Sequence, residues 1–203
     1  MIDPTLSSKT QEIYDRNAEG FDRHRSKTLF EKSWLDCLAD TLPQKAEILD
    51  LGCGSGDPIA KYFIGLGHLV TGVDFSAPML KIAEQRFSHN LWVQMDMRQL
   101  DLSKRFDAII AWNSFFHLTR DEQRAMFPLF ANHLKPGGKL LFTTGPSDGE
   151  VAGTVNGEAI YHASLSADEY TSLLASIDMR VLTHIAEDPD CGMHTVWLAQ
   201  KND

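Results

Sequence analysis

The chain has only three cysteines among its 203 residues, Cys37, Cys53 and Cys191, and they lie far apart. No Cys-x-x-Cys pair is present, so the sequence offers neither a disulfide framework nor the ligand spacing of a zinc site. Unpaired cysteines are typical of a reducing compartment, and residues 1–5 lack the basic-then-apolar pattern of a signal peptide. We therefore expect a cytoplasmic protein.

Long apolar runs and an excess of positive charge are also missing. No segment approaches the roughly 18 apolar residues of a membrane-spanning helix. The formal net charge is −9, whereas a nucleic-acid footprint is normally basic. The nearest candidate for a basic binding stripe is formed by Arg16, Arg23, Arg25 and Lys27, but these residues are interleaved with Asp15, Glu19 and Asp22. This pattern favours a solvated helix face over a binding stripe. We expect neither a nucleic acid nor a membrane as partner.

Apolar strand patterns and helical patterns alternate after residue 45, and the length fits one domain with a sizeable core. This alternation predicts a parallel sheet with helices packed on it. The expected strands span residues 46–51, 69–74, 91–96, 106–112 and 139–144. The expected helices span residues 58–66, 77–87 and 121–134, and the turn Pro136-Gly137-Gly138 follows the last of them.

The C-terminal part breaks this alternation. After an expected helix over 167–177, strands over 180–186 and 195–199 are joined by the short segment 187–194. A parallel crossover needs a dozen or more residues, so these strands form an antiparallel hairpin. We predict an α/β fold, a Rossmann-like doubly wound sheet of five parallel strands plus a C-terminal antiparallel hairpin.

The chain is predicted to be a single domain over residues 1–203. Residues 1–42 precede the first strand and carry helical patterns over 8–25 and 29–42. We expect them to form an N-terminal helical cap over the ligand mouth of an α/β core spanning residues 43–203.

Residues 48–58 read Ile-Leu-Asp-Leu-Gly-Cys-Gly-Ser-Gly-Asp-Pro, a buried-strand pattern that leads through three glycines to a helix start. Glycine permits the positive φ that such a turn needs and keeps no side chain between backbone and ligand. A dinucleotide turn has glycine at its first, third and sixth positions, but the sixth position counted from Gly52 is Asp57. We expect Asp57 and Pro58 to be the N-cap and first-turn proline of the next helix, where a negative charge opposes a pyrophosphate.

No Gly-Lys-Ser/Thr follows these glycines, which excludes a P-loop. The pattern favours a ligand without phosphates. The backbone positions expected to hold it are Gly52, Gly54 and Gly56.

Three acidic residues stand at the ends of three successive expected strands: Asp50, Asp74 and Asp96. Ligands of such sheets bind outside the carboxyl ends of the strands, so the three carboxylates should converge on one site.

Four segments together resemble the class I S-adenosylmethionine (SAM)-dependent methyltransferase family over nearly the whole chain. They are 48–56, 70–76 (Val-Thr-Gly-Val-Asp-Phe-Ser), 93–97 and 134–141 (Leu-Lys-Pro-Gly-Gly-Lys-Leu-Leu). The resemblance implies SAM as the cofactor and S-adenosylhomocysteine as its product. A sheet closed by an antiparallel hairpin is also the pattern of this family, whereas a dinucleotide-binding sheet would continue in parallel.

The resemblance also implies residue roles. Asp74 would accept hydrogen bonds from both ribose hydroxyls, which the carboxylate charge strengthens. Asp50 would place the ammonium of the methionine moiety, directly or through water; capping of the glycine loop is the alternative.

At the adenine end, the resemblance implies that Asp96 and the backbone amide of Met97 read the ring edge. Phe75 and Met79 would hold the ring between them. Core packing is the alternative for both of these apolar residues.

Residues 112–117, Trp-Asn-Ser-Phe-Phe-His, follow the fourth expected strand, where sulfonium and substrate would meet. We expect Trp112 to line the cofactor and Asn113 and Phe116 to line the substrate. A general base is needed only if the nucleophile is protonated at neutral pH, and His117 is the candidate. A histidine hydrogen-bonded to neighbouring backbone explains it equally well.

Tyr161 and His162, after a loop containing Gly157, form a second polar aromatic pair that either faces the substrate or supports the loop. Tyr14 is a further candidate substrate contact that closes the cap, and Trp34 either joins it or lies in the core.

The remaining histidines show no pairing at metal-ligand spacing, so we expect no metal: His24, His68, His89, His133, His184 and His194. The sequence thus predicts a SAM-dependent methyltransferase that acts on an oxygen or nitrogen of a small molecule. A noncatalytic SAM-binding or regulatory protein is the alternative, and an NAD-linked oxidoreductase is disfavoured by Asp57 and the terminal hairpin.

Overall fold

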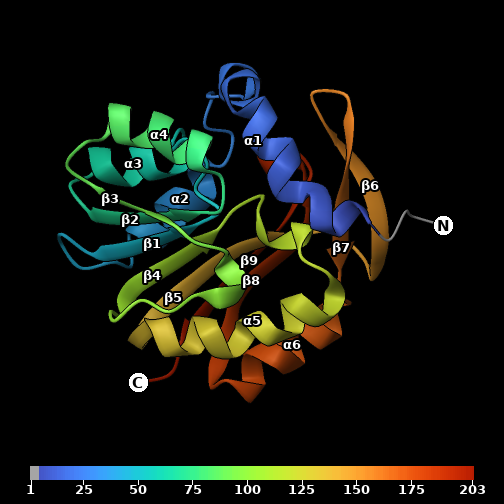
Figure 1. The fold of residues 1–203 in the computed structure, drawn as a ribbon. Coiled ribbons are helices and arrows are strands. Elements are labelled where there is room, and N and C mark those ends of the chain that lie inside the picture. Colours follow the sequence, from blue (N-terminus) through green and yellow to red (C-terminus); the bar gives the residue numbers. More distant parts are fainter. Residues whose placement is uncertain (1–4) are drawn as a thin grey trace.

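The structure is a computed structural model that describes residues 5–203. Residues 1–4, which entered the signal-peptide prediction, lie outside it. A seven-stranded sheet with strand order β3-β2-β1-β4-β5-β9-β8 runs through the molecule (Figure 1). The first five strands are parallel, and β9 lies antiparallel between β5 and β8. The predicted fold class is confirmed.

The sheet contains β1 (Glu47–Leu51), β2 (Leu69–Asp74), β3 (Leu91–Gln94), β4 (Phe106–Ala111), β5 (Leu134–Thr144), β8 (Met179–Asp188) and β9 (His194–Lys201). The helices are α1 (Leu6–His24), α2 (Lys32–Ala39), α3 (Ile59–Gly65), α4 (Ala77–Arg86), α5 (Arg120–His133) and α6 (Ala167–Ser176). Three short 3₁₀ turns are η1 (Met97–Gln99), η2 (Phe115–His117) and η3 (Pro189–Cys191).

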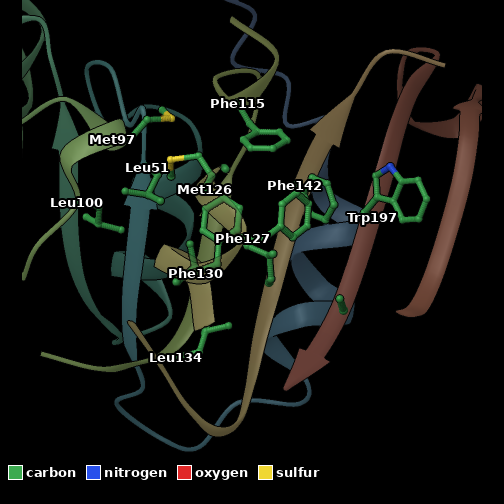
Figure 2. Packing of buried hydrophobic residues seen from close by; sticks show 14 of the residues in the cluster. Leu51, Met97, Leu100, Phe115, Met126, Phe127, Phe130, Leu134, Phe142 and Trp197 are labelled. Atoms are coloured by element: carbon green, nitrogen blue, oxygen red, sulfur yellow. The ribbon is translucent and has the colours of Figure 1, made fainter. Parts of the chain in front are cut away.

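The sheet has a separate apolar cluster on each face. One cluster packs the sheet against α5 and α6 and is rich in aromatic rings, among them Phe115, Phe127, Phe142 and Trp197 (Figure 2). The other packs it against α2, α3 and α4. Because both faces are covered, the parallel strands are apolar on both sides, as such sheets require.

Helix α5 begins at a capping box, in which Thr119 and Glu122 satisfy each other's backbone N–H groups. Strand β5 starts at Leu134, directly after this helix, and is longer than predicted. The turn Pro136-Gly137-Gly138 lies inside it, where the pairing with β4 shifts register between Phe106 and Ala108. The sequence predicts a turn that separates the helix from the strand, but the structure places these residues within β5, with pairing to β4 on both sides of them.

Residues 149–164 form a second sheet that was predicted only as a loop. Strands β6 (Gly149–Val155) and β7 (Glu158–Ser164) pair antiparallel through the two-residue turn Asn156-Gly157. Both turn residues have positive φ, 48° and 84°, as the hairpin turns that favour Asn-Gly require. That dipeptide was therefore the signal that the sequence reading missed.

The two N-terminal helices have different roles. Helix α1 spans the gap between α4 and the β6–β7 hairpin (Figure 1) and packs with the hairpin through Ile13, Val155 and Ile160. Helix α2 instead belongs to a face of the sheet, where Trp34 is buried and its Nε1 donates to Asp188. Of the predicted cap, only α1 covers the ligand mouth, and Trp34 is a core residue. Within residues 5–203, no helix combines the length and apolarity needed to cross a membrane.

Candidate active site

A central cleft lies at the carboxyl ends of β1, β2 and β4, beneath α1. It holds about 700 Å³ of empty space, part of it open to solvent. The strands and the loops that follow them contribute Asp50, Asp74, Trp112, Asn113 and others. Helix α1 contributes Tyr14 and Phe21, and Arg25 follows directly after it. Most of the predicted site residues are therefore brought together here.

Two buried carboxylates face this cleft. Asp50 is 3% exposed, and its Oδ2 has no hydrogen-bond partner. Asp74 is 8% exposed, and its carboxylate accepts the backbone N–H groups of Gly54 and Ser76, each at 2.8 Å. Burial, with a smaller contribution from the charge of Asp74, raises the pKa of Asp50 to about 7. Burial also raises the pKa of Asp74 to about 6, against the lowering effect of its N–H donors.

The three glycines of the loop after β1 have different surroundings. A Cβ on Gly52 would lie 2.2 Å from the Cβ of Ser114, and one on Gly56 would lie 2.8 Å from the Trp92 ring. Both glycines therefore permit close packing of protein on protein. A Cβ on Gly54, which has φ +53°, would meet no protein atom within 4 Å and would project into the cleft that Gly54 lines. Gly56, a predicted ligand contact, does not line the cleft.

A side pocket continues the central cleft between α1 and η1. The two cavities share Phe75, Met97, Ser114 and His117, and the side pocket adds Asp96. Met79 is almost fully buried and lines the central cleft beside Phe75.

Asp96 lies two residues beyond the end of β3. It caps η1, and its carboxylate is held by both the backbone N–H and the guanidinium of Arg98. Arg98 in turn pairs with Glu122 at 2.6 Å. The carboxylate predicted to read adenine is thus already engaged by a neighbouring arginine.

Helix α1 is fixed to the walls of the cleft by one buried aspartate. Asp22 accepts a hydrogen bond from Ser55 Oγ at 2.6 Å, and its carboxylate is held by the guanidinium of Arg86 on α4. These contacts join the cap to the glycine loop and to α4. Neither Asp22 nor Arg25 belongs to the solvated face that was predicted: the Arg25 side chain is 16% exposed and pairs with the fully buried Glu31.

The tautomer of His117 follows from its two partners. Nδ1 lies 3.1 Å from the carbonyl oxygen of Tyr161, which can only accept, so Nδ1 carries the proton. Nε2 then accepts the Tyr14 hydroxyl at 3.0 Å. Burial, followed by the charge of His162, lowers the pKa of His117 to about 3. His117 is therefore a neutral ring with both nitrogens occupied.

His194 lines the outer part of the site, although the sequence gives it no role beyond the absence of metal-ligand spacing. Its Nδ1 donates to the carbonyl of Cys191, and its Nε2 accepts Asn113 Nδ2 at 3.1 Å. Its ring also stacks on Trp112 with centroids 5.9 Å apart. The pairing with Asn113 crosses 81 residues, so no local pattern could have indicated it.

An outer cleft of about 810 Å³ opens from the central cleft toward the β6–β7 hairpin. The residues shared by the two cavities are Tyr14, Phe21, Arg25, Asn113 and His117. The outer cleft adds the predicted residues Phe116 and His162.

Tyr161 lies apart from these cavities. Side chains alternate along a strand, so the Tyr161 and His162 side chains of β7 point to opposite faces of the hairpin. Tyr161 reaches the site only through its carbonyl, which holds His117. The structure does not place its side chain in the clefts.

Asp57 also differs from its predicted role. Helix α3 has Pro58 as its N-cap, without a side-chain hydrogen bond. The Asp57 carboxylate turns instead to Lys61 at 3.3 Å and Lys27 at 3.8 Å.

Residues 5–203 contain no group of three or more His, Cys, Asp and Glu placed to share a metal ion, and metal independence stays a prediction.

The chain is similar to proteins that are described as methyltransferases. A methyltransferase-domain model matches residues 48–138. A putative methyltransferase, YqeM of Bacillus subtilis (strain 168), is 35% identical over 136 residues, which cover 64% of this chain and 54% of that protein. A malonyl-[acyl-carrier protein] O-methyltransferase of Enterobacter lignolyticus is 31% identical over 138 residues, covering 66% and 53%. The chain thus spans about half the length of these two curated relatives.

A solved structure has a similar fold over the whole chain. It is the Burkholderia thailandensis 1,6-didemethyltoxoflavin-N1-methyltransferase with bound 1,6-didemethyltoxoflavin and S-adenosylhomocysteine. The TM-score is 0.76 at 21% identity, covering 100% of this chain and 92% of the other.

Proposed function

Because this chain belongs to the class I SAM-dependent methyltransferase family, we propose that it transfers the methyl group of SAM to an oxygen or nitrogen of a small molecule. The central cleft and its side pocket would hold SAM, and the outer cleft would hold the acceptor. The two sites meet at Tyr14, Asn113 and His117, which line both the central and the outer cleft.

The observation that carries this proposal is the unpaired Oδ2 of the buried Asp50. A buried carboxylate without a partner is costly to the protein alone, and SAM supplies the missing cation through its ammonium. Arg25 also lines this cleft, and its guanidinium would be shared between Glu31 and the methionine carboxylate. The residues present thus fit both charged ends of an amino acid.

Asp74 fits the ribose. Each of its oxygens accepts one backbone N–H, and a carboxylate oxygen has a second lone pair to offer a ribose hydroxyl. Phe75, Met79 and Met97 provide the apolar walls for adenine. Asp96 would read the adenine edge only in competition with Arg98, so the backbone amide of Met97 is the less encumbered contact.

SAM supplies an electrophilic methyl group on a sulfonium, and the protein's tasks are to align the acceptor with it and to exclude water. Helix α1 covers the cleft and is fixed by Asp22 to Ser55 and Arg86. Tyr14 and His117 hold each other at the junction with the outer cleft. With both ring nitrogens occupied, His117 would serve there to orient Tyr14.

The acceptor site is supported by the continuity of the two clefts, which a protein that only binds SAM does not need. The relatives do not decide between oxygen and nitrogen, since one is named an O-methyltransferase and the fold neighbour an N1-methyltransferase. The acidic total charge favours a small molecule over a nucleic acid.

Two measurements test the proposal. Calorimetric titration should show SAM binding, and incubation with methyl-labelled SAM and a metabolite extract should yield S-adenosylhomocysteine and one labelled product. Binding without product formation would indicate the noncatalytic SAM-binding alternative. Absence of SAM binding would contradict the proposal as a whole.

A further inference from the structure

Three imidazoles line the outer cleft, and only one has free ring nitrogens. His117 is held by Tyr14 and Tyr161, and His194 by Asn113 and Cys191. Within residues 5–203, no protein group forms a hydrogen bond with either nitrogen of His162. His162 is therefore the imidazole of the cleft that remains available to accept a proton.

The hairpin holds the His162 ring in one place. Its centroid lies 4.7 Å from that of Phe116 and 4.9 Å from that of His117. The pairs Val151–His162 and Gly153–Ile160 put Gly153 diagonally beside it on the same face of the hairpin. A Cβ on Gly153 would lie 2.3 Å from the ring. The imidazole therefore packs directly against the Gly153 backbone, and any side chain at this position would collide with it.

This position is one ring beyond the junction of the two clefts, because His117 lines both. An acceptor atom at the junction would lie within reach of His162, directly or through one water. His162 is also half-buried and lines a further cavity, which Asp148 and Glu150 at the start of the hairpin line as well. A proton taken up there has a route to solvent.

The lining of the outer cleft indicates what it accepts. It combines rings and neutral hydrogen-bonding groups with apolar residues such as Val155 and Met193. Its one full charge, Arg25, is already paired with Glu31. The outer cleft has no carboxylate among its described lining residues to hold a protonated amine. Its aromatic faces suit a planar, uncharged ring.

We propose that His162 is the general base of the acceptor site, and that its substrate is an uncharged aromatic ring bearing a hydroxyl or ring N–H. This inference rests on the proposed methyl transfer. As the acceptor's lone pair bonds to the methyl carbon, the carbon–sulfur bond breaks and its electrons stay on sulfur. The acceptor's proton moves to a free nitrogen of His162 and leaves as the imidazolium deprotonates to solvent.

Burial lowers the pKa of His162, which keeps the ring neutral and able to accept at neutral pH. The charged and titratable groups around it are Tyr14 from α1, Arg25 just after α1, His117 from η2, His194 from β9, and Asp148 and Glu150 at the start of the hairpin. Asp148 is paired with Arg120 at 2.6 Å.

The first test needs no acceptor. Imidazole resonances of the unliganded protein, assigned with H162Q, are followed from about pH 8 down to about pH 4. His162 should titrate with a pKa below the ordinary imidazole value of about 6.5, while His117 remains neutral down to about pH 4. A His162 resonance that stays constant over this scan overturns the proposal.

The second test uses labelled SAM and a series of substituted phenols and ring N–H heterocycles whose pKa values run from about 7 to about 10. At pH 7, H162Q should lower transfer to the least acidic members by roughly 100-fold. The defect should shrink toward onefold for the most acidic, because an acceptor that is already ionised needs no base.

The control is H184Q, the same substitution at an imidazole that stacks on Trp197 outside the clefts, which should leave transfer unchanged. An H162Q defect that is equal for all acceptors would indicate a structural role and overturn the base. Failure of wild-type protein to methylate any member while binding SAM would overturn the acceptor class. Failure to bind SAM would instead contradict the proposed function.

Discussion

The central and outer clefts share a wall but differ in chemistry. The central cleft buries two carboxylates, Asp50 and Asp74, with raised pKa values. The outer cleft presents neutral imidazoles and aromatic rings, with the paired Arg25 as its one full charge. Unsatisfied negative charge suits a ligand that brings its own cation, whereas neutral rings suit an acceptor that must stay uncharged to react. This difference supports the proposal that the central cleft binds SAM and the outer cleft binds the acceptor.

The largest effect should come from filling the central cleft at Gly54. A G54V side chain would project into the cleft, because a Cβ there meets no protein atom within 4 Å. We expect calorimetry to show at least a roughly 100-fold loss of SAM affinity, or about 2.7 kcal/mol. The matched control is G67V, since Gly67 also has positive φ (+86°) and open space but follows α3 away from the cleft.

Both valines should lower the melting temperature through similar backbone strain, while only G54V should lose SAM. Equal SAM affinity in the two variants would show that the glycine loop does not face the ligand.

Removing Asp74, the proposed acceptor of the ribose hydroxyls, should have the next largest effect. D74A should weaken SAM binding about tenfold or more, because a hydrogen bond to a charged acceptor contributes roughly 1.5 to 3 kcal/mol. D107A is the control: Asp107 also accepts a backbone N–H, that of Glu47, but it lies near the amino end of β4, whereas the cleft lies at the carboxyl ends of the strands. Unchanged SAM affinity in a folded D74A protein would remove the ribose assignment.

The buried Asp50 carboxylate should lower the stability of the unliganded protein at neutral pH and should strengthen SAM binding. Its folded pKa of about 7 exceeds the unfolded value near 3.9, so the native state binds the proton more tightly. The unliganded protein should therefore lose stability as pH rises from about 4 to about 7. D50N should abolish most of this loss and raise the free energy of unfolding at pH 8 by at least about 1.4 kcal/mol, the equivalent of a pKa difference of one.

The same D50N substitution should weaken SAM binding about tenfold. Denaturant unfolding and calorimetry on one preparation measure both effects. A D50N protein that is less stable than wild type at pH 8 would mean that Asp50 stabilises the glycine loop.

The smallest effect should come from removing the hydroxyl of Tyr161 on β7. Y161F should leave SAM affinity and the rate of methyl transfer within about twofold of wild type, since the residue reaches the site only through its carbonyl. A much larger loss in a variant with unchanged melting temperature would place the Tyr161 hydroxyl in the acceptor site.

The central cleft was predictable from the sequence because its parts are local. Asp50 and Gly54 stand next to each other on one strand–turn unit, and Asp74 ends the next strand, so the parallel topology alone brings them together. The outer cleft depends on pairings between distant segments, such as His194 with Asn113 and His117 with Tyr161. The β6–β7 hairpin had one local signal in the sequence, the turn Asn156-Gly157. The other contacts of the outer cleft are tertiary contacts between distant segments.

The sequence also could not distinguish the roles of residues that look alike in the pattern. Gly52 and Gly56 look like Gly54 in the pattern, yet both serve protein packing. Arg25 reads as one charge on a solvated helix, but it follows the end of α1 and turns inward to Glu31. Such distinctions depend on which side chains lie opposite, and strand or helix periodicity does not encode this.

The central claim is that the buried Asp50 carboxylate binds the ammonium of SAM, and the pH dependence of SAM affinity tests this claim most directly. Calorimetric titrations of wild type and D50N at pH 6 and pH 7.5 would separate the ionisation of this carboxylate from other effects. Wild type should bind SAM about fivefold to tenfold more tightly at pH 7.5, because ionising Asp50 ceases to oppose binding above its pKa of about 7, and D50N should change by no more than about twofold. Wild-type affinity that is independent of pH, or an equal pH dependence in D50N, would contradict the account.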